Sequence, residues 1–216
     1  MFVRATVYLA VILGLVAAPA AAFEGRGTPS PGVATPAFFT EGTTLDGAGG
    51  FAKWTSMLQR HVRQGGNTRG CDGEGADCAY EAWLVRLLRL AEAPVRERIA
   101  TVNRWVNQNR YVSDKEAFGL RDYWATPREF LAGAGDCEDF AILKYLSLRA
   151  LGIAADDMRI VVLEDTRDGL PHAVLVVRID GAAVVLDNRT SIIAAPMEVP
   201  HYRAYYAVNE YGWWRA

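Results

Sequence analysis

The sequence predicts an α+β fold, in which a helical N-terminal part is followed by an antiparallel β-sheet. Three observations point to this class. Between residues 51 and 151, apolar residues recur every three or four positions, which is typical of one face of a helix. From residue 158 onward they alternate at every second position, as in half-buried strands. The dipeptide Asp180-Gly181, between two alternating runs, is a strong hairpin signal.

The first 22 residues are typical of a secretory signal peptide. Arg4 provides positive charge, and the apolar run from Val7 to Ala18 is too short to span a bilayer comfortably. Small residues follow, so we expect cleavage near Ala22–Phe23 and export of the mature chain. An uncleaved N-terminal anchor is the alternative.

Residues 23–50 are rich in glycine, proline, threonine and serine, which predicts an extended arm. Residues 51–216 fit one compact domain, and no segment in them is apolar enough to cross a membrane. A formal net charge of −2, without a block of basic residues, disfavours nucleic acid as a partner.

Turn and capping residues separate the predicted helices. Pro94 suits the first turn of one helix, because this turn leaves its N–H groups unpaired and proline has none. Thr126, Pro127 and Glu129 form another helix start, in which Glu129 reaches back to the capping residue. Gly152 ends the last helix. The predicted helices span residues 51–64, 80–91, 94–106, 127–132 and 136–151, with irregular chain over residues 107–125.

The predicted strands follow the helices. If Asp180-Gly181 is a two-residue turn, Ile179 pairs with Ala182. Counting back along both strands places His172 and Asp187 on one face as diagonal neighbours, about 7–8 Å apart. A register shift of one residue would place them on opposite faces. The strands are predicted over residues 158–163, 172–179 and 182–187, and the alternating aromatic residues of 201–216 indicate one more.

The chain has three cysteines. Cys71 and Cys78 bracket a polar, glycine-rich loop and could form a disulfide in an oxidising compartment. A metal site in this acidic loop is the alternative, although no second pair of soft ligands is nearby. The disulfide would leave Cys137 unpaired.

Cys137 is a candidate nucleophile, because it lies at the predicted start of a helix. The free N–H groups and the dipole of a helix start favour a thiolate and can stabilise an oxyanion. A buried structural cysteine is the alternative, but the neighbours of Cys137 are polar. Thiol catalysis also needs a base and a group that orients it, and His172 and Asp187 are the candidates for these roles. Taken alone, each of them is more typical of a structural residue.

Three segments together resemble a known family. They are DYWATPREFLAGAGDCEDFAILKYLSLRALGI (residues 122–153), PHAVLVV (171–177) and VVLDN (184–188). The chain from Phe51 onward resembles the bacterial transglutaminase-like cysteine peptidases, and among them the type that releases biofilm adhesins. The resemblance implies a papain-like, transglutaminase-like core and a catalytic triad of Cys137, His172 and Asp187.

The same resemblance implies a location, a cofactor and partners. Members of this type act in the periplasm, require calcium, and cleave large outer-membrane-anchored adhesins near their N-terminus at a paired-alanine site. The periplasmic domain of an inner-membrane cyclic-di-GMP receptor sequesters them. A transglutaminase or amide-transfer reaction, which uses the same thioester, is the alternative enzyme function. A binding module without activity is the alternative from another class.

The calcium requirement offers a role for the acidic residues around Cys137. Carboxylate oxygens are the ligands that Ca²⁺ prefers, and Asp136 and Asp139, three residues apart in a helical turn, can converge with Glu138 beside them. A bound cation would then lower the energetic cost of a thiolate among carboxylates. Alternatively, Asp136 caps the helix while Glu138 and Asp139 favour its positive end. Both can hold together.

Overall fold

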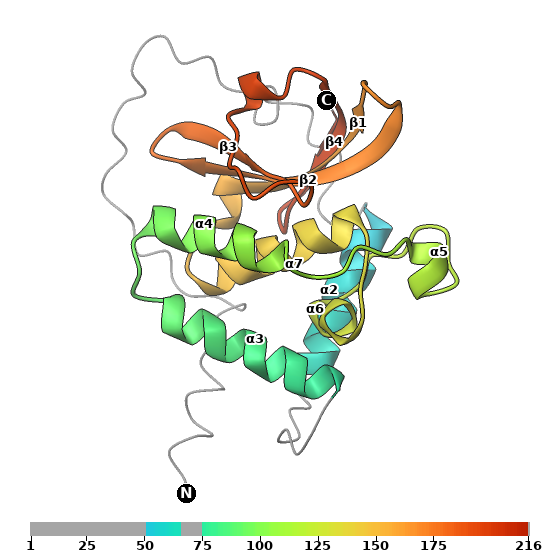
Figure 1. Ribbon diagram of the computed structural model, residues 1–216, viewed down its shortest axis with the longest axis vertical. Coiled ribbons are helices and arrows are strands. Elements are labelled where there is room, and N and C mark those ends of the chain that lie inside the picture. Colours follow the sequence, from blue (N-terminus) through green and yellow to red (C-terminus); the bar gives the residue numbers. More distant parts are fainter. Residues whose placement is uncertain (1–50, 66–74, 216) are drawn as a thin grey trace, which may run out of the picture. The chain divides into compact units, whose positions relative to one another are not determined.

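The computed structural model describes residues 51–65 and 75–215 (Figure 1). The predicted signal peptide at residues 1–22, the predicted arm at residues 23–50 and Cys71 lie outside this part of the chain. Within it, all the α-helices precede a five-stranded antiparallel sheet, so the predicted α+β class is confirmed.

The helices follow the prediction with three differences. The helix predicted to begin at Tyr80 begins four residues earlier, at Ala76, because the segment with Cys78 that was predicted as loop forms its first turn. Pro94 is the capping residue of its helix and not part of the first turn. The segment predicted as irregular contains a short helix. The helices are α2 (Ala52–Gly65), α3 (Ala76–Leu90), α4 (Val95–Val106), α5 (Asp114–Ala117), α6 (Pro127–Ala132) and α7 (Cys137–Ala150).

The sheet has the strand order β3-β2-β1-β4-β5. The C-terminal segment forms two strands and not one, because Asn209 closes a turn between them by accepting a hydrogen bond from the N–H of Tyr211. The strands are β1 (Met158–Asp165), β2 (Leu170–Ile179), β3 (Ala182–Leu186), β4 (Tyr202–Val208) and β5 (Trp213–Arg215). Short 3₁₀ turns, η3 (Ala155–Asp157) and η4 (Pro196–Glu198), precede β1 and β4.

The hairpin between β2 and β3 has the predicted register. Asp180 and Gly181 have φ values of 50° and 79°, and two positive values are typical of a type I′ turn. Ile179 pairs with Ala182, and Leu175 pairs with Leu186. This register is confirmed, and it brings the residues that follow β3 beside the start of β2.

Helix α7 is the central element of the described chain. It packs against β1 and β2 on one side and against α4 and α6 on the other (Figure 1). Its residues from Asp139 to Leu148 are all buried, as is expected of a helix that has protein on every side. The opposite face of the sheet has its own apolar cluster, which includes Val161, Val174 and Tyr202. The first turn of α7, with Cys137 and Glu138, lies beside the start of β2, because these residues line one pocket with His172 and Ala173.

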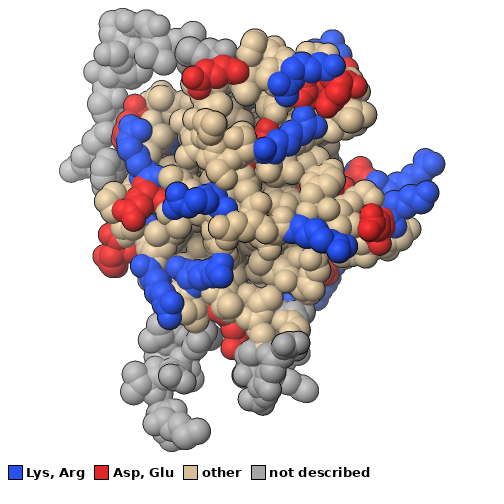
Figure 2. All heavy atoms as spheres, in the orientation of Figure 1, with Lys and Arg blue, Asp and Glu red and all other residues tan. Residues whose placement is uncertain are grey.

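Among the described residues, no helix is both long and apolar enough to cross a membrane. On the face shown in Figure 2, basic and acidic side chains are interspersed, and neither sign covers a continuous area. Charge on this face is therefore locally balanced.

Candidate active site

Cys137 is the first residue of α7, and Asp136 precedes it as the capping residue. The carboxylate of Asp139 accepts hydrogen bonds from the N–H groups of Asp136, at 3.2 Å, and Ala125, at 2.7 Å. Gly135 leaves room for this carboxylate, because a Cβ at position 135 would lie 2.2 Å from its Oδ2. The loop before α7 is thus closed around Asp139, which fixes where the thiol points.

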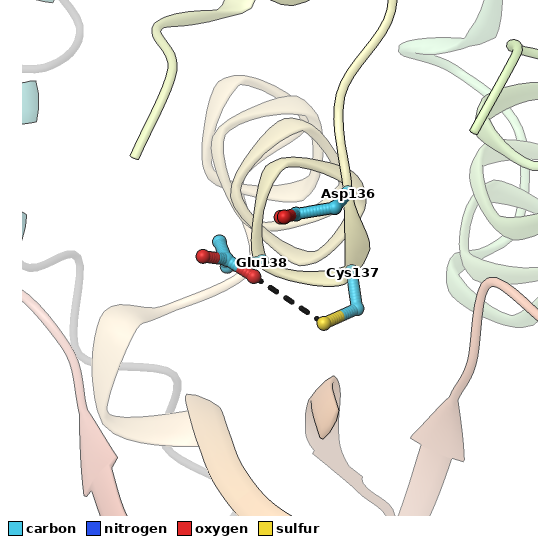
Figure 3. Close-up of side chains that lie close together, drawn as sticks. All are labelled: Asp136, Cys137 and Glu138. Atoms are coloured by element: carbon cyan, nitrogen blue, oxygen red, sulfur yellow. Dashed lines mark hydrogen bonds between the residues drawn. The ribbon is translucent and has the colours of Figure 1, made fainter. Parts of the chain in front are cut away.

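The thiol lies in a pocket of about 110 Å³. Cys137, His172 and Ala173 line this pocket together, and Trp124, Pro171 and Tyr206 line it as well. The thiol donates a hydrogen bond to Oε2 of Glu138 at 3.3 Å (Figure 3). Cys137 is a free cysteine, as expected, whereas Cys78 is disulfide-bonded. Because Cys71 lies outside the described residues, its pairing with Cys78 stays a prediction.

The electrostatic surroundings disfavour a thiolate at Cys137. Burial raises the pKa of the thiol, and the charges of Glu138 and Asp136 raise it further. The N–H of Ala173 acts in the opposite direction through a hydrogen bond to Cys137. Burial and Asp136 also raise the pKa of Glu138 well above its usual range. These groups therefore lack a compensating positive charge.

His172 and Asp187 lie in direct contact. Nε2 of His172 is 3.0 Å from Oδ1 of Asp187, and both side chains are buried. Burial raises the pKa of Asp187, but the hydrogen bond and charge of His172 outweigh it and lower the pKa to about 2. An ionised carboxylate only accepts hydrogen bonds, so Nε2 carries the proton. In neutral His172 this leaves Nδ1 free to accept a proton.

Three further groups hold Asp187, and none of them was predicted. The hydroxyl of Tyr202 donates to Oδ2 at 2.5 Å, and the N–H of Arg189 donates to Oδ1 at 2.9 Å. The side chain of Asn107, from the end of α4, donates to the carbonyl oxygen of Asp187 at 2.8 Å. The loop after β3 is thus anchored to β4 and to α4. The catalytic roles of Cys137, His172 and Asp187 stay predictions.

The three predicted metal ligands lie in overlapping acidic clusters. In one cluster, carboxylate oxygens of Asp114, Asp136 and Asp139 lie within 4.8 Å of one another. In the other, carboxylate oxygens of Asp114, Asp122 and Glu138 lie within the same distance of one another. Oδ1 of Asp114 and Oδ1 of Asp136 are buried and have no hydrogen-bond partner among the described residues. Burial raises the pKa of Asp114 to about 6. Such a set of carboxylate oxygens is the kind of ligand set that binds a hard cation.

Asp114 and Asp122 were missed because their segment lacks an apolar pattern. The signal that could have found them is chemical: each is an acidic residue in the stretch before the predicted ligands. Asp114 begins α5, the short helix absent from the prediction. Its Oδ2 accepts a hydrogen bond from the N–H of Tyr123, which fixes its position.

Lys144 places an unusual charge in α7. Its side chain is fully buried, and Nζ has no hydrogen-bond partner among the residues described. Burial lowers the pKa of Lys144 to about 7, whereas the charge of Asp187 raises it. Near neutral pH, a positive charge therefore exists in the core at an energetic cost.

Replacing Lys144 with methionine is expected to stabilise the protein at pH 6. The unfolded chain keeps this proton up to the ordinary pKa of 10.5 and the folded chain only to about 7, so wild-type stability rises between these values. Methionine has a similar volume, and removing the buried charge should raise the free energy of unfolding by on the order of 4 kcal/mol.

Urea denaturation of both proteins across the pH range measures this difference. It should shrink toward zero as the pH approaches 10.5. The exposed Lys115 provides the control, since Lys115→Met should change little at any pH. A Lys144→Met protein less stable than wild type at pH 6 would mean that the ammonium has a favourable partner.

The family model and the solved structures that match this chain point to the same family. The family described as bacterial transglutaminase-like cysteine proteinase (BTLCP) matches residues 62–212. LapG from Legionella pneumophila, in an EGTA-treated form, is 32% identical with a TM-score of 0.60, and the match covers 67% of this chain and 80% of that chain. A calcium-bound form of LapG has the same identity, TM-score and coverage of this chain, and 81% of that chain is covered. Comparison with curated proteins found no match.

Proposed function

This chain belongs to the family of bacterial transglutaminase-like cysteine proteinases, and we propose that it is a calcium-dependent endopeptidase of the periplasm. Its proposed substrate is a large adhesin anchored in the outer membrane, which it cleaves near the N-terminus at a paired-alanine site. Cleavage would release the adhesin and promote biofilm dispersal. One observation supports a peptidase most strongly: Cys137 and His172 line one pocket, while Asp187 engages Nε2 of His172.

In the proposed reaction, Nδ1 of His172 takes the proton of the Cys137 thiol, and the sulfur attacks the scissile carbonyl carbon. The ionised Asp187 stabilises the imidazolium that forms. The imidazolium then gives its proton to the leaving amine nitrogen as the C–N bond breaks, which leaves an acyl-thioester on Cys137. His172 next deprotonates a water molecule that attacks the thioester, so that the acid leaves and the thiol is restored.

Two features support negative charge at Cys137 during this reaction. The thiol lies in the first turn of α7, where the helix dipole favours an anion. The N–H of Ala173 donates a hydrogen bond to Cys137. This hydrogen bond would strengthen as the sulfur becomes charged. The carboxylates of Asp136 and Glu138 oppose both effects.

We propose that Asp136, Glu138 and Asp139 hold calcium together with Asp114. The buried, unpartnered oxygens of Asp114 and Asp136 support this assignment. A bound dication supplies positive charge beside the carboxylates that raise the pKa of the thiol. The calcium-bound form of LapG from Legionella pneumophila supports the choice of metal.

The family resemblance also supports a sequestering partner. We propose that the periplasmic domain of an inner-membrane cyclic-di-GMP receptor binds the enzyme and withholds it from the adhesin. Titrating that purified domain into a cleavage reaction should inhibit cleavage at a stoichiometric ratio.

Cleavage of an adhesin fragment tests the proposed function. The mature protein is incubated with an N-terminal adhesin fragment that contains a paired-alanine site, in calcium or in EGTA, and with Cys137→Ala as the inactive control. We expect cleavage by the wild-type protein in calcium alone. Cleavage by Cys137→Ala would contradict the mechanism, and cleavage in EGTA would contradict the metal. Coupling of an added amine without hydrolysis would favour amide transfer.

A further inference from the structure

Tyr202 connects the β1–β4 strand pair to the His172–Asp187 pair. It is the first residue of β4, where it pairs with Asp165 of β1. Its hydroxyl donates to Oδ2 of Asp187 at 2.5 Å. Its ring meets the ring of His172 edge-on, with centroids 5.7 Å apart and planes at 61°. One side chain thus contacts both members of the pair.

The two oxygens of Asp187 are held by different donors. Oδ1 accepts from His172 and from the N–H of Arg189, whereas Tyr202 is the donor to Oδ2 within the described part of the chain. The terminal torsion of an aspartate is soft and roughly two-fold, so donors to one oxygen alone restrain it weakly. A second donor on the far oxygen prevents the carboxylate from turning away from Nε2.

Tyr202 is itself fixed in place. It belongs to the apolar cluster on the sheet face opposite α7, and its side chain is almost fully buried. The ring of His201 packs on the ring of Tyr202, with centroids 4.5 Å apart. The carbonyl oxygen of His201 in turn accepts hydrogen bonds from the N–H and hydroxyl of Thr166. Burial and the bond to Asp187 raise the pKa of Tyr202, so the hydroxyl remains a donor at physiological pH.

We propose that Tyr202 is a positioning residue that holds Asp187 and the His172 ring in the orientation needed for proton transfer with Cys137. This inference rests on the proposed peptidase function. Tyr202 acts through Asp187 and His172 and does not touch the substrate. Its loss should therefore slow the chemical step and leave substrate affinity nearly unchanged.

Two variants on the same strand test the proposal. Tyr202→Phe keeps the ring and removes the hydroxyl. Tyr205→Phe is the matched control, because its exposed hydroxyl also donates to a carboxylate, that of Glu164, at 3.0 Å but away from the pocket. For the adhesin fragment, we expect Tyr202→Phe to lower kcat by about tenfold, as the loss of one hydrogen bond to a charged group predicts. KM should change less than about twofold.

A proton NMR measurement reads the His172–Asp187 bond without needing a substrate. The Nε2 proton of His172 should give a downfield signal in the wild type and in Tyr205→Phe. In Tyr202→Phe this signal should broaden, because the looser pair exchanges its proton with water faster. If the wild type cleaves no adhesin, the proposed function fails, and the NMR signal still decides the role of Tyr202.

Three outcomes would overturn the proposal. An unchanged signal together with a kcat within about twofold of wild type would show that the hydroxyl does not restrain the pair. An equal loss of kcat in Tyr205→Phe would indicate a general effect on β4. A rise in KM at constant kcat would place Tyr202 in contact with the substrate. Tyr202→Leu, which also removes the ring, should lower kcat further than Tyr202→Phe.

Discussion

Replacing Asp187 with asparagine is expected to lower kcat by about 10³-fold while the protein stays folded. His172 and the N–H of Arg189 both donate to Oδ1, so the amide oxygen can take this place. The amide nitrogen then faces the Tyr202 hydroxyl, whose oxygen can accept a hydrogen bond. The geometry therefore survives, but the negative charge that stabilises the imidazolium is lost.

Steady-state kinetics with the adhesin fragment measure this loss, and a thermal melt checks the fold. The matched control is Asp168→Asn, which alters an exposed carboxylate on the turn before β2 and should keep kcat within about twofold of wild type. An Asp187→Asn enzyme with more than a tenth of wild-type kcat would remove Asp187 from the mechanism.

Calcium is expected to accelerate alkylation of Cys137 by iodoacetamide by at least about tenfold, because each unit by which the pKa falls raises the thiolate fraction about tenfold. Without a cation, the thiol is hydrogen-bonded to Glu138, and burial and the charges of Glu138 and Asp136 raise its pKa. A dication held by these carboxylates opposes their charge. Alkylation in calcium and in EGTA, followed by mass spectrometry, measures the effect without a substrate.

Glu138→Gln separates the charge of this residue from its size. In EGTA at neutral pH this variant should be alkylated at a rate close to that of the wild type, since the raised pKa already leaves Glu138 largely uncharged there. Calcium should accelerate its alkylation less than that of the wild type, because one carboxylate ligand is gone. Glu92→Gln, which changes an exposed glutamate in the turn after α3, should behave like the wild type. Equal rates in calcium and EGTA for the wild-type protein would mean that the carboxylates do not serve a cation.

The features that the sequence predicted well are local in the chain. Asp180-Gly181 determines the β2–β3 register through its own backbone torsions, and that register places His172 beside Asp187. The start of α6 follows in the same way from Thr126 and Glu129, whose reciprocal capping bonds span three residues. Such signals depend on a few neighbouring residues and are readable without tertiary structure.

The features that could not be predicted from the sequence depend on packing between distant segments. Tyr202 reaches Asp187 because β4 pairs with β1, and no pattern near residue 202 reveals this pairing. Asp114 joins the predicted metal ligands because residue 112 binds the loop before α7 through the carbonyl oxygen of Gly135. Asp114 and Tyr202 both have ordinary sequence surroundings, and their roles become visible only when the elements are assembled.

Capture of the acyl-enzyme tests the central claim most directly. The mature protein is mixed with the adhesin fragment in calcium, quenched in acid during the first turnover, and its peptides are analysed by mass spectrometry. The mechanism predicts the N-terminal part of the fragment attached as a thioester to the peptide that contains Cys137, with no adduct in Cys137→Ala or in EGTA. Fragment cleavage without an adduct, which persists in Cys137→Ala, would contradict nucleophilic catalysis by this cysteine.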